Sequence, residues 1–291
     1  MGNRDYYFES DDKMIEIQGE YLNHIQRMFT LAGFSVVEAS EASQAVMMIE
    51  RQLALAHFSQ VKLRDSQANY HLYTVDSLKA SFPGFCWDTY FATLGCPELK
   101  EISVSQEEPI RKSIEIMNTA QIKDLRYYMQ WQVLSAAASY MSDEFAEEKF
   151  NFHGKVISGR QEQSPRWKRA VSVVDGSLGM AVGKLYCEKY FNADAKARME
   201  TLCANLLKAY GERIDNLEWM SDETKAKAHE KLSTFYVKVG YPNKWEDYTA
   251  LEINPAESYW TLVKRVSKFN TARSIAKLSK PVDKDEWYMT P

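Results

Sequence analysis

Five histidines are the side chains of this 291-residue chain best suited to metal-assisted chemistry. A zinc peptidase usually carries two histidines four positions apart on one helix face, with a glutamate between them that activates a metal-bound water. No histidine here has a second within four positions, and His229-Glu230 reads HEKLS without the second histidine. The spacing predicts isolated surface or half-buried histidines and no metal ligand. They are His24, His57, His71, His153 and His229.

Other catalytic patterns are also missing from the sequence. It contains no Gly-x-Ser-x-Gly nucleophile turn, phosphate-binding loop or dinucleotide fingerprint. The paired acids Glu107-Glu108 and Glu147-Glu148 fall on predicted polar faces or in loops, which indicates solvated surface rather than a catalytic dyad. The residues themselves therefore assign no catalytic residue and no metal ligand, and they leave the substrate-binding residues unknown.

The four cysteines form no Cys-x-x-Cys pair, so we expect small buried hydrophobic residues. Their disulfide state stays open, since pairing would need an oxidising compartment. The cysteines are Cys86, Cys96, Cys187 and Cys203.

Composition limits the partners and the fold class. The net charge is −4 and no long basic run exists, which argues against nucleic acid and anionic membranes as partners. No apolar run approaches the roughly 18 residues that span a bilayer, and residues 1–12 lack the apolar core of a signal peptide. Only 12 glycines and 8 prolines are present, which argues against a turn-rich β fold.

Helical spacing dominates the chain and predicts an all-α, multihelical fold with little or no β structure and helix over at least half of the residues. The one strand candidate is residues 102–104. Inward faces are predicted at Met14, Ile17, Tyr21, Ile25 and Met28; at Leu125, Met129, Val133, Ala136 and Tyr140; and at Met199, Leu202, Leu206 and Tyr210. Helix starts are predicted at Ser10, Ser40, Thr74, Ser142, Asn192, Ser221 and Pro255.

Residues 166–191 are the stretch around which the other elements are expected to be organised. Each helical glycine costs about 1 kcal/mol relative to alanine, so three of them on one stripe predict a long buried helix with a neighbouring helix packed close. A turn at Asp175-Gly176 that splits two helices is the alternative. The glycines are Gly176, Gly179 and Gly183, and the apolar face is Trp167, Val171, Val174, Leu178, Val182 and Leu185.

The same stretch, an Arg-Trp pair followed by a glycine-spaced helix and Val-Gly-Lys-Leu-Tyr, resembles the neprilysin family of zinc metallopeptidases. Further motifs of that family occur in the expected order, which makes chance similarity improbable. They lie at residues 3–7 (Asn-Arg-Asp-Tyr-Tyr), 63–65, 219–226, 240–248 and 281–287.

The resemblance implies that this chain is an internal piece of a longer zinc-dependent metalloendopeptidase that cleaves peptides and small polypeptides. Residues 1–240 would form a helical cap-type domain that walls the substrate chamber, and residues 241–291 would lead into a catalytic domain absent here. Zinc would belong to the parent, with no ligand in this chain. Its partners would be peptide substrates and the missing catalytic domain.

A helical binding or scaffold module without an enzymatic parent is the alternative from another class. The reading frame after Pro291 separates the two, because the resemblance expects Asn-Ala-Tyr and then HExxH there. The family favours a periplasmic or extracellular location, with the cytoplasm left open. Peptide specificity, oligomeric state and whether Met1 is native are not determined by the sequence.

The purified chain is expected to bind no stoichiometric zinc, because no pair of histidines has ligand spacing. Elemental analysis after dialysis measures this directly. One tightly held zinc per chain would reveal a site built from distant residues.

Overall fold

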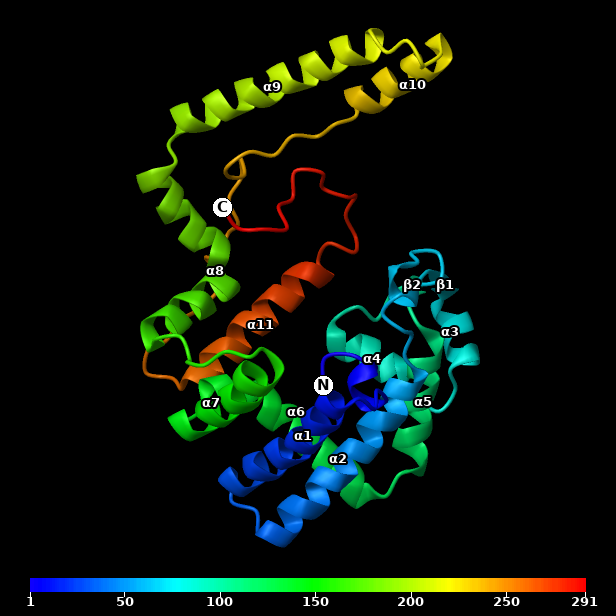
Figure 1. The fold of residues 1–291 in the computed structure, drawn as a ribbon, viewed down its shortest axis with the longest axis vertical. Coiled ribbons are helices and arrows are strands. Elements are labelled where there is room, and N and C mark those ends of the chain that lie inside the picture. The colour runs from blue at the N-terminus through cyan, green and yellow to red at the C-terminus, as the bar shows by residue number, and fades with distance from the viewer. The chain divides into compact units, whose positions relative to one another are not determined.

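The computed structural model describes all 291 residues and is predominantly helical (Figure 1). Helix accounts for 64% of the chain, which confirms the prediction of more than half. The only sheet has two strands, so the all-α class is also confirmed. The chain forms two compact units: the first comprises residues 1–163, 255–264 and 268–276, and the second comprises residues 164–254, 265–267 and 277–291.

The first unit contains most of the helices and both strands. Its α-helices are α1 Asp12–Leu31, α2 Val36–Ala56, α3 Val75–Ser81, α4 Trp87–Leu94, α5 Glu107–Thr119, α6 Ile122–Ala137, α7 Asp143–Lys149 and most of α11 Tyr259–Ile275. Short 3₁₀ turns are η1 Asp5–Tyr7, η2 Lys62–Arg64 and η3 Ala138–Tyr140, and η4 Phe150–Ile157 is a π-helix. The strands are β1 His71–Thr74 and β2 Glu101–Val104.

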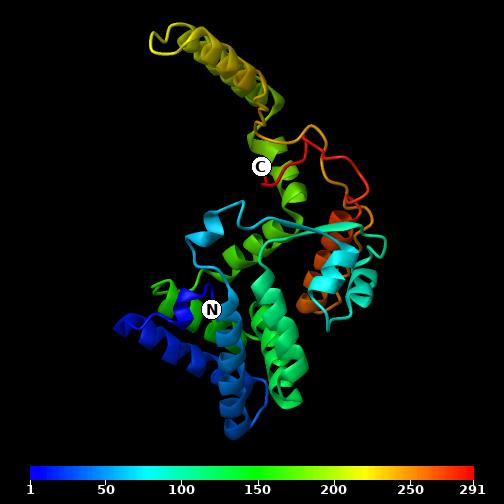
Figure 2. The ribbon, with the colours of Figure 1, turned by 90° about the vertical axis from the view of Figure 1, so that its right-hand side faces the viewer.

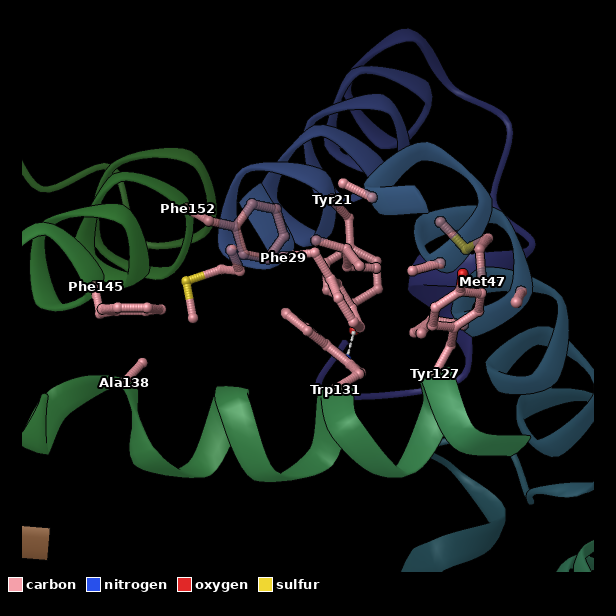
Figure 3. Packing of buried hydrophobic residues seen from close by; sticks show 14 of the residues in the cluster. Tyr21, Phe29, Met47, Tyr127, Trp131, Ala138, Phe145 and Phe152 are labelled. Atoms are coloured by element: carbon pink, nitrogen blue, oxygen red, sulfur yellow. Dashed lines mark hydrogen bonds between the residues drawn. The ribbon is translucent and has the colours of Figure 1, made fainter. Parts of the chain in front are cut away.

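The larger core of this unit lies between α1, α2, α6 and α7. Ile25, Met28 and Phe29 of α1 are fully buried; Ile25 and Met28 belong to the predicted α1 face, whereas Phe29 was not included in it. Trp131 and Tyr127 of α6 contact Tyr21 and Phe29 of α1 (Figure 3). Large aromatic side chains thus supply much of the buried area, which is the main source of stability in such a helical core.

The predicted face of α6 is wrong. Met129 and Val133 are more than half exposed, whereas Tyr127 and Trp131 are buried. Both stripes have helical spacing, so periodicity alone could not choose between them. The aromatic pair contacts the α1 core, and the larger apolar area that it buries favours this face.

Local capping chemistry explains where the first two helices begin. The Asp11 side chain accepts the Met14 amide at α1, and Ser35 and Glu38 form a reciprocal capping box at α2. The predicted starts at Ser10 and Ser40 are therefore wrong by one and five residues. The capping residues Thr74, Asn192 and Ser221 are confirmed by side-chain hydrogen bonds, and α7 follows Ser142. The last helix begins after Ser258, not at Pro255.

A smaller core lies beside the two-stranded sheet. β1 pairs antiparallel with β2, with His71 opposite Val104 and Thr74 opposite Glu101. The predicted strand at residues 102–104 is confirmed, whereas β1 was not foreseen. The fully or nearly buried residues of this cluster come from α3, α4, β2 and α5: Leu78, Phe82, Phe91, Val104 and Ile114.

The second unit contains α8 Arg166–Tyr190, α9 Ala193–Asp215 and α10 Asp222–Ser233. α9 and α10 run side by side as a helical hairpin in both views (Figures 1 and 2). No residue of α9 is buried, so its predicted inward face is exposed in the described chain. That face consists of Met199, Leu202, Leu206 and Tyr210.

α8 differs from the predicted buried helix. Trp167, Val171 and Leu185 on the predicted apolar face are exposed. The helix is continuous through Asp175-Gly176 but is kinked at Leu178, where the backbone has φ −130° and ψ 32°. Gly179 and Gly183 are buried as expected, but the residues that cover them are Thr290 and Pro291 rather than a neighbouring helix.

None of the helices combines the length and apolar character that crossing a membrane demands.

Replacing Ile25 by alanine is expected to lower the free energy of unfolding by about 2–5 kcal/mol, because the side chain is completely buried. Ile15→Ala on the same helix is the matched control, since Ile15 is 56% exposed. Urea unfolding measures both variants. Equal losses would contradict the packing of α1 described here.

Candidate functional site

The five histidines come from different elements, and two of them meet: the rings of His24 in α1 and His153 in the π-helix lie edge to face, with 5.7 Å between their centroids. His57 follows α2, His71 lies in β1 with Nδ1 3.0 Å from the Val104 carbonyl, and His229 of α10 contacts Asp215 of α9. Nowhere do three or more His, Cys, Asp or Glu side chains gather in a way that could hold a metal ion.

Two of the buried polar residues, His24 of α1 and Glu148 of α7, form a cluster with the partly exposed Arg27 of α1, which we call the carboxylate cluster. Oε1 of Glu148 lies 2.8 Å from His24 Nδ1 and 2.9 Å from Arg27 Nε. Glu148 is 7% exposed and His24 is 1% exposed. Sequence reasoning placed both among surface or half-buried groups, which is wrong. The contact between His24 and Glu148 could not be predicted, because these residues are far apart in the sequence.

The charge states within the carboxylate cluster follow from the partners. Burial alone would raise the pKa of Glu148, but hydrogen bonds from His24 and Arg27 outweigh it and hold that pKa below its ordinary value. An ionised carboxylate only accepts, so the proton on His24 is assigned to Nδ1. Burial lowers the pKa of His24, although Glu148 opposes the shift. The cluster is therefore a neutral imidazole and an arginine on one carboxylate.

Aromatic rings close the carboxylate cluster. Phe152 of the π-helix stacks on His24, with 4.9 Å between ring centroids and 12° between planes. Trp131 meets the same imidazole edge-on at 5.6 Å. The ring is thus held on two sides, and it is not free to act as a general base toward a substrate. The carboxylate cluster therefore has a structural role, in which it holds α1, α7 and the π-helix together.

A second buried polar group joins η1 to α1 and α2. Oε2 of Glu50 accepts hydrogen bonds from Tyr7 at 2.8 Å and Tyr21 at 2.7 Å. Trp131 Nε1 donates to the Tyr21 hydroxyl at 3.3 Å, the contact drawn in Figure 3. Burial, together with the negative charge of Glu50, raises the pKa of both tyrosines, so both hydroxyls stay protonated donors. The hydrogen bond to Glu50 gives Tyr7, the last residue of the motif at residues 3–7, a structural role.

The motif at residues 240–248 has a structural basis in the second unit. Gly240 has φ +69°, and a Cβ there would overlap the ring of Phe191. Lys196 donates to the Tyr241 carbonyl at 2.7 Å and to Asn243 Oδ1 at 2.9 Å. These contacts attach the segment to the start of α9 and present no reactive group.

All four cysteines are free thiols. Only Cys187 is buried, and Cys86 is exposed, so the expectation of four buried residues is wrong for Cys86. Cys96 and Cys203 are of intermediate exposure.

Comparison with known proteins identifies the family. The model named Peptidase_M13_N, described as peptidase family M13, matches residues 1–242. This chain belongs to peptidase family M13. The neprilysin-like resemblance is thereby confirmed, and the helical architecture of this part of the chain is shared with solved members of the family.

The relatives are much longer than this chain. Neutral endopeptidase of Lactobacillus helveticus is 28% identical over 90% of this chain and 40% of its own length. Human endothelin-converting enzyme 1 is 28% identical over 99% of this chain and 39% of its length. The zinc metalloprotease Zmp1 of Mycobacterium tuberculosis in its open state is 36% identical with a TM-score of 0.91, covering 100% of this chain and 45% of that protein. The chain thus spans about two fifths of their length.

Acidification is expected to destabilise the first unit. The pKa of His24 is lower in the folded chain than in the unfolded one, so the unfolded state binds the proton more readily as the pH falls. The positive charges of Arg27 and Lys149 also lower the pKa of His24, whereas Glu148 raises it. The contribution of His24 to the free energy of unfolding is then fully present above about pH 6.5, and it is lost as the pH falls below that value.

Urea midpoints at pH 7 and pH 5 measure this dependence. His24→Asn should reduce the difference between the two pH values. His57→Asn is the control, because His57 is exposed and should leave the difference unchanged. An undiminished difference in His24→Asn would assign the pH effect to other groups.

Proposed function

We propose that this chain is part of a zinc-dependent metalloendopeptidase that cleaves peptides and small polypeptides. The observation that carries the proposal is the likeness to the zinc metalloprotease Zmp1 over the whole chain at 36% identity. The match of residues 1–242 to peptidase family M13 supports it independently. Human endothelin-converting enzyme 1 and the Lactobacillus endopeptidase are relatives whose names denote peptide processing.

Within that enzyme, we propose that this chain shapes the substrate chamber. Residues 1–240 would act as a helical cap-type domain that walls the substrate chamber, and residues 241–291 would lead into the catalytic domain. The rigid aromatic core around Trp131 suits a wall, because a packed core resists deformation. Zinc and its ligands would lie on the catalytic domain, since no group of this chain fits the metal.

A helical binding module is the second candidate. The exposed apolar face of α9, which includes Leu202, Leu206 and Tyr210, is the observation that favours it. The two candidates differ in outcome: only the peptidase gains chelator-sensitive cleavage when the remaining segments of a family member are supplied.

The isolated chain is expected to show no cleavage of a quenched fluorescent peptide, with or without added zinc. Hydrolysis by this route requires a metal-bound water and a base to take its proton, and no three His, Cys, Asp or Glu side chains of the chain gather to hold that metal. Coexpression with the upstream and downstream segments should restore cleavage that a chelator abolishes. Turnover by the purified chain alone that copurifies with it would contradict the proposal, and failure of coexpression would favour the binding module.

A further inference from the structure

The last residues of the chain are seated on a glycine face of α8. We call residues 277–291 the strap, and Gly179 with Gly183 the glycine socket. The two glycines are four residues apart, so they lie on the same side of the helix. Both are buried, and the atoms nearest to their missing Cβ positions belong to Thr290 and Pro291 of the strap.

The fit leaves no room for a side chain in the socket. A Cβ built on Gly183 would lie 2.6 Å from Cδ and 3.0 Å from Cγ of Pro291. A Cβ on Gly179 would overlap Cγ2 of Thr290. Gly176, on the same helix, has no atom within 4 Å of its Cβ position and is exposed. The need for glycine is therefore specific to the two positions beneath the strap.

A second set of contacts fixes the strap further upstream. Asp285 accepts a hydrogen bond from the Tyr236 hydroxyl, and the carbonyl of Glu286 accepts one from Lys238 at 2.5 Å. The Glu286 carboxylate pairs with Lys277. Between these contacts and the socket, Tyr288 is 85% exposed and Met289 is 71% exposed. The intervening residues contribute little burial of their own, so the course of the strap depends on its two fixed ends.

The socket also coincides with the kink of α8. Leu178, the residue with non-helical φ and ψ, immediately precedes Gly179. The helix changes direction where the strap is seated, and the shape of the socket is therefore linked to the kink. A side chain that expels the strap would remove the contacts that cover this part of the helix.

We propose that the glycine socket is a positioning device: Gly179 and Gly183 hold Thr290 and Pro291 on α8 and so fix the course of residues 285–291. The inference rests on the proposed function only for its effect on activity. In the proposed enzyme, the strap is part of residues 241–291, which would lead into the catalytic domain. An unseated strap would lower the fraction of molecules in the competent arrangement and the apparent activity in proportion.

Chymotrypsin cleavage after Trp287 and Tyr288 in the 291-residue chain tests the socket without any assay of activity. Gly179→Ala and Gly183→Ala should each speed this cleavage by about tenfold or more, because overpacking shifts the local opening equilibrium. Cleavage within α1 should stay unchanged, which distinguishes strap release from general unfolding. Gly176→Ala is the matched control and should leave the rate of strap cleavage unchanged.

Removing the atoms that collide provides a rescue. In a Pro291→Ala background, which lacks the Cγ and Cδ atoms, Gly183→Ala should have little further effect on strap cleavage. Thr290→Ala should do the same for Gly179→Ala. Unchanged strap cleavage in both glycine variants, an equal effect of Gly176→Ala, or a full effect without rescue would overturn the socket.

Activity of the coexpressed peptidase separates this inference from the proposed function. Gly183→Ala should lower kcat/KM in parallel with the loss of strap protection, and Pro291→Ala should abolish most of the difference. If the unsubstituted assembly shows no chelator-sensitive cleavage of the peptide substrate, the proposed function fails while the chymotrypsin result still decides the socket. If cleavage is present but Gly183→Ala leaves it unchanged while releasing the strap, the positioning role is overturned.

Discussion

The contact between Glu148 and the α1 helix is the constraint on which the architecture of the first unit depends. A carboxylate this deeply buried is unfavourable unless charged and hydrogen-bonded partners compensate for its lost hydration. His24 and Arg27 supply both, at 2.8 and 2.9 Å. Because these partners lie one helical turn apart, they fix the rotation of α1 as well as its distance from α7. The aromatic core around Trp131 can then close in only one arrangement.

Much of the fold was predictable because local rules and tertiary packing agree. Thr74, Asn192 and Ser221 cap their helices with their own side chains, which is chemistry confined to a few neighbouring residues. The α1 face was also correct, since its apolar residues form one unbroken stripe. The family was predictable because its motifs keep their order along the chain, and the match over residues 1–242 confirms it.

The failures share a physical cause: each depended on a partner remote in sequence. α6 carries two apolar stripes, and only contact with α1 selects the one containing Trp131. The sequence around Glu148 is typical of an exposed helix face, and only the contact with His24 shows why this glutamate is buried. The glycines of α8 did indicate close packing, but the spacing of Gly179 and Gly183 carries no information about whether a helix or an extended segment fills the space. No catalytic site was predicted, because no spacing of residues in the sequence is typical of one.

The β1–β2 pairing has a consequence for the order in which the chain folds. It joins residues 71–74 to 101–104, so the loop it closes is short and its entropic cost is small. The small core on α3 and α4 can therefore assemble from contiguous sequence. His24 and Glu148, by contrast, are 124 residues apart. During synthesis the sheet subdomain can form as soon as its own residues emerge, whereas α1, with α2 packed against it, must wait for α7 to complete its core, which makes that interval the one in which a chaperone would matter most.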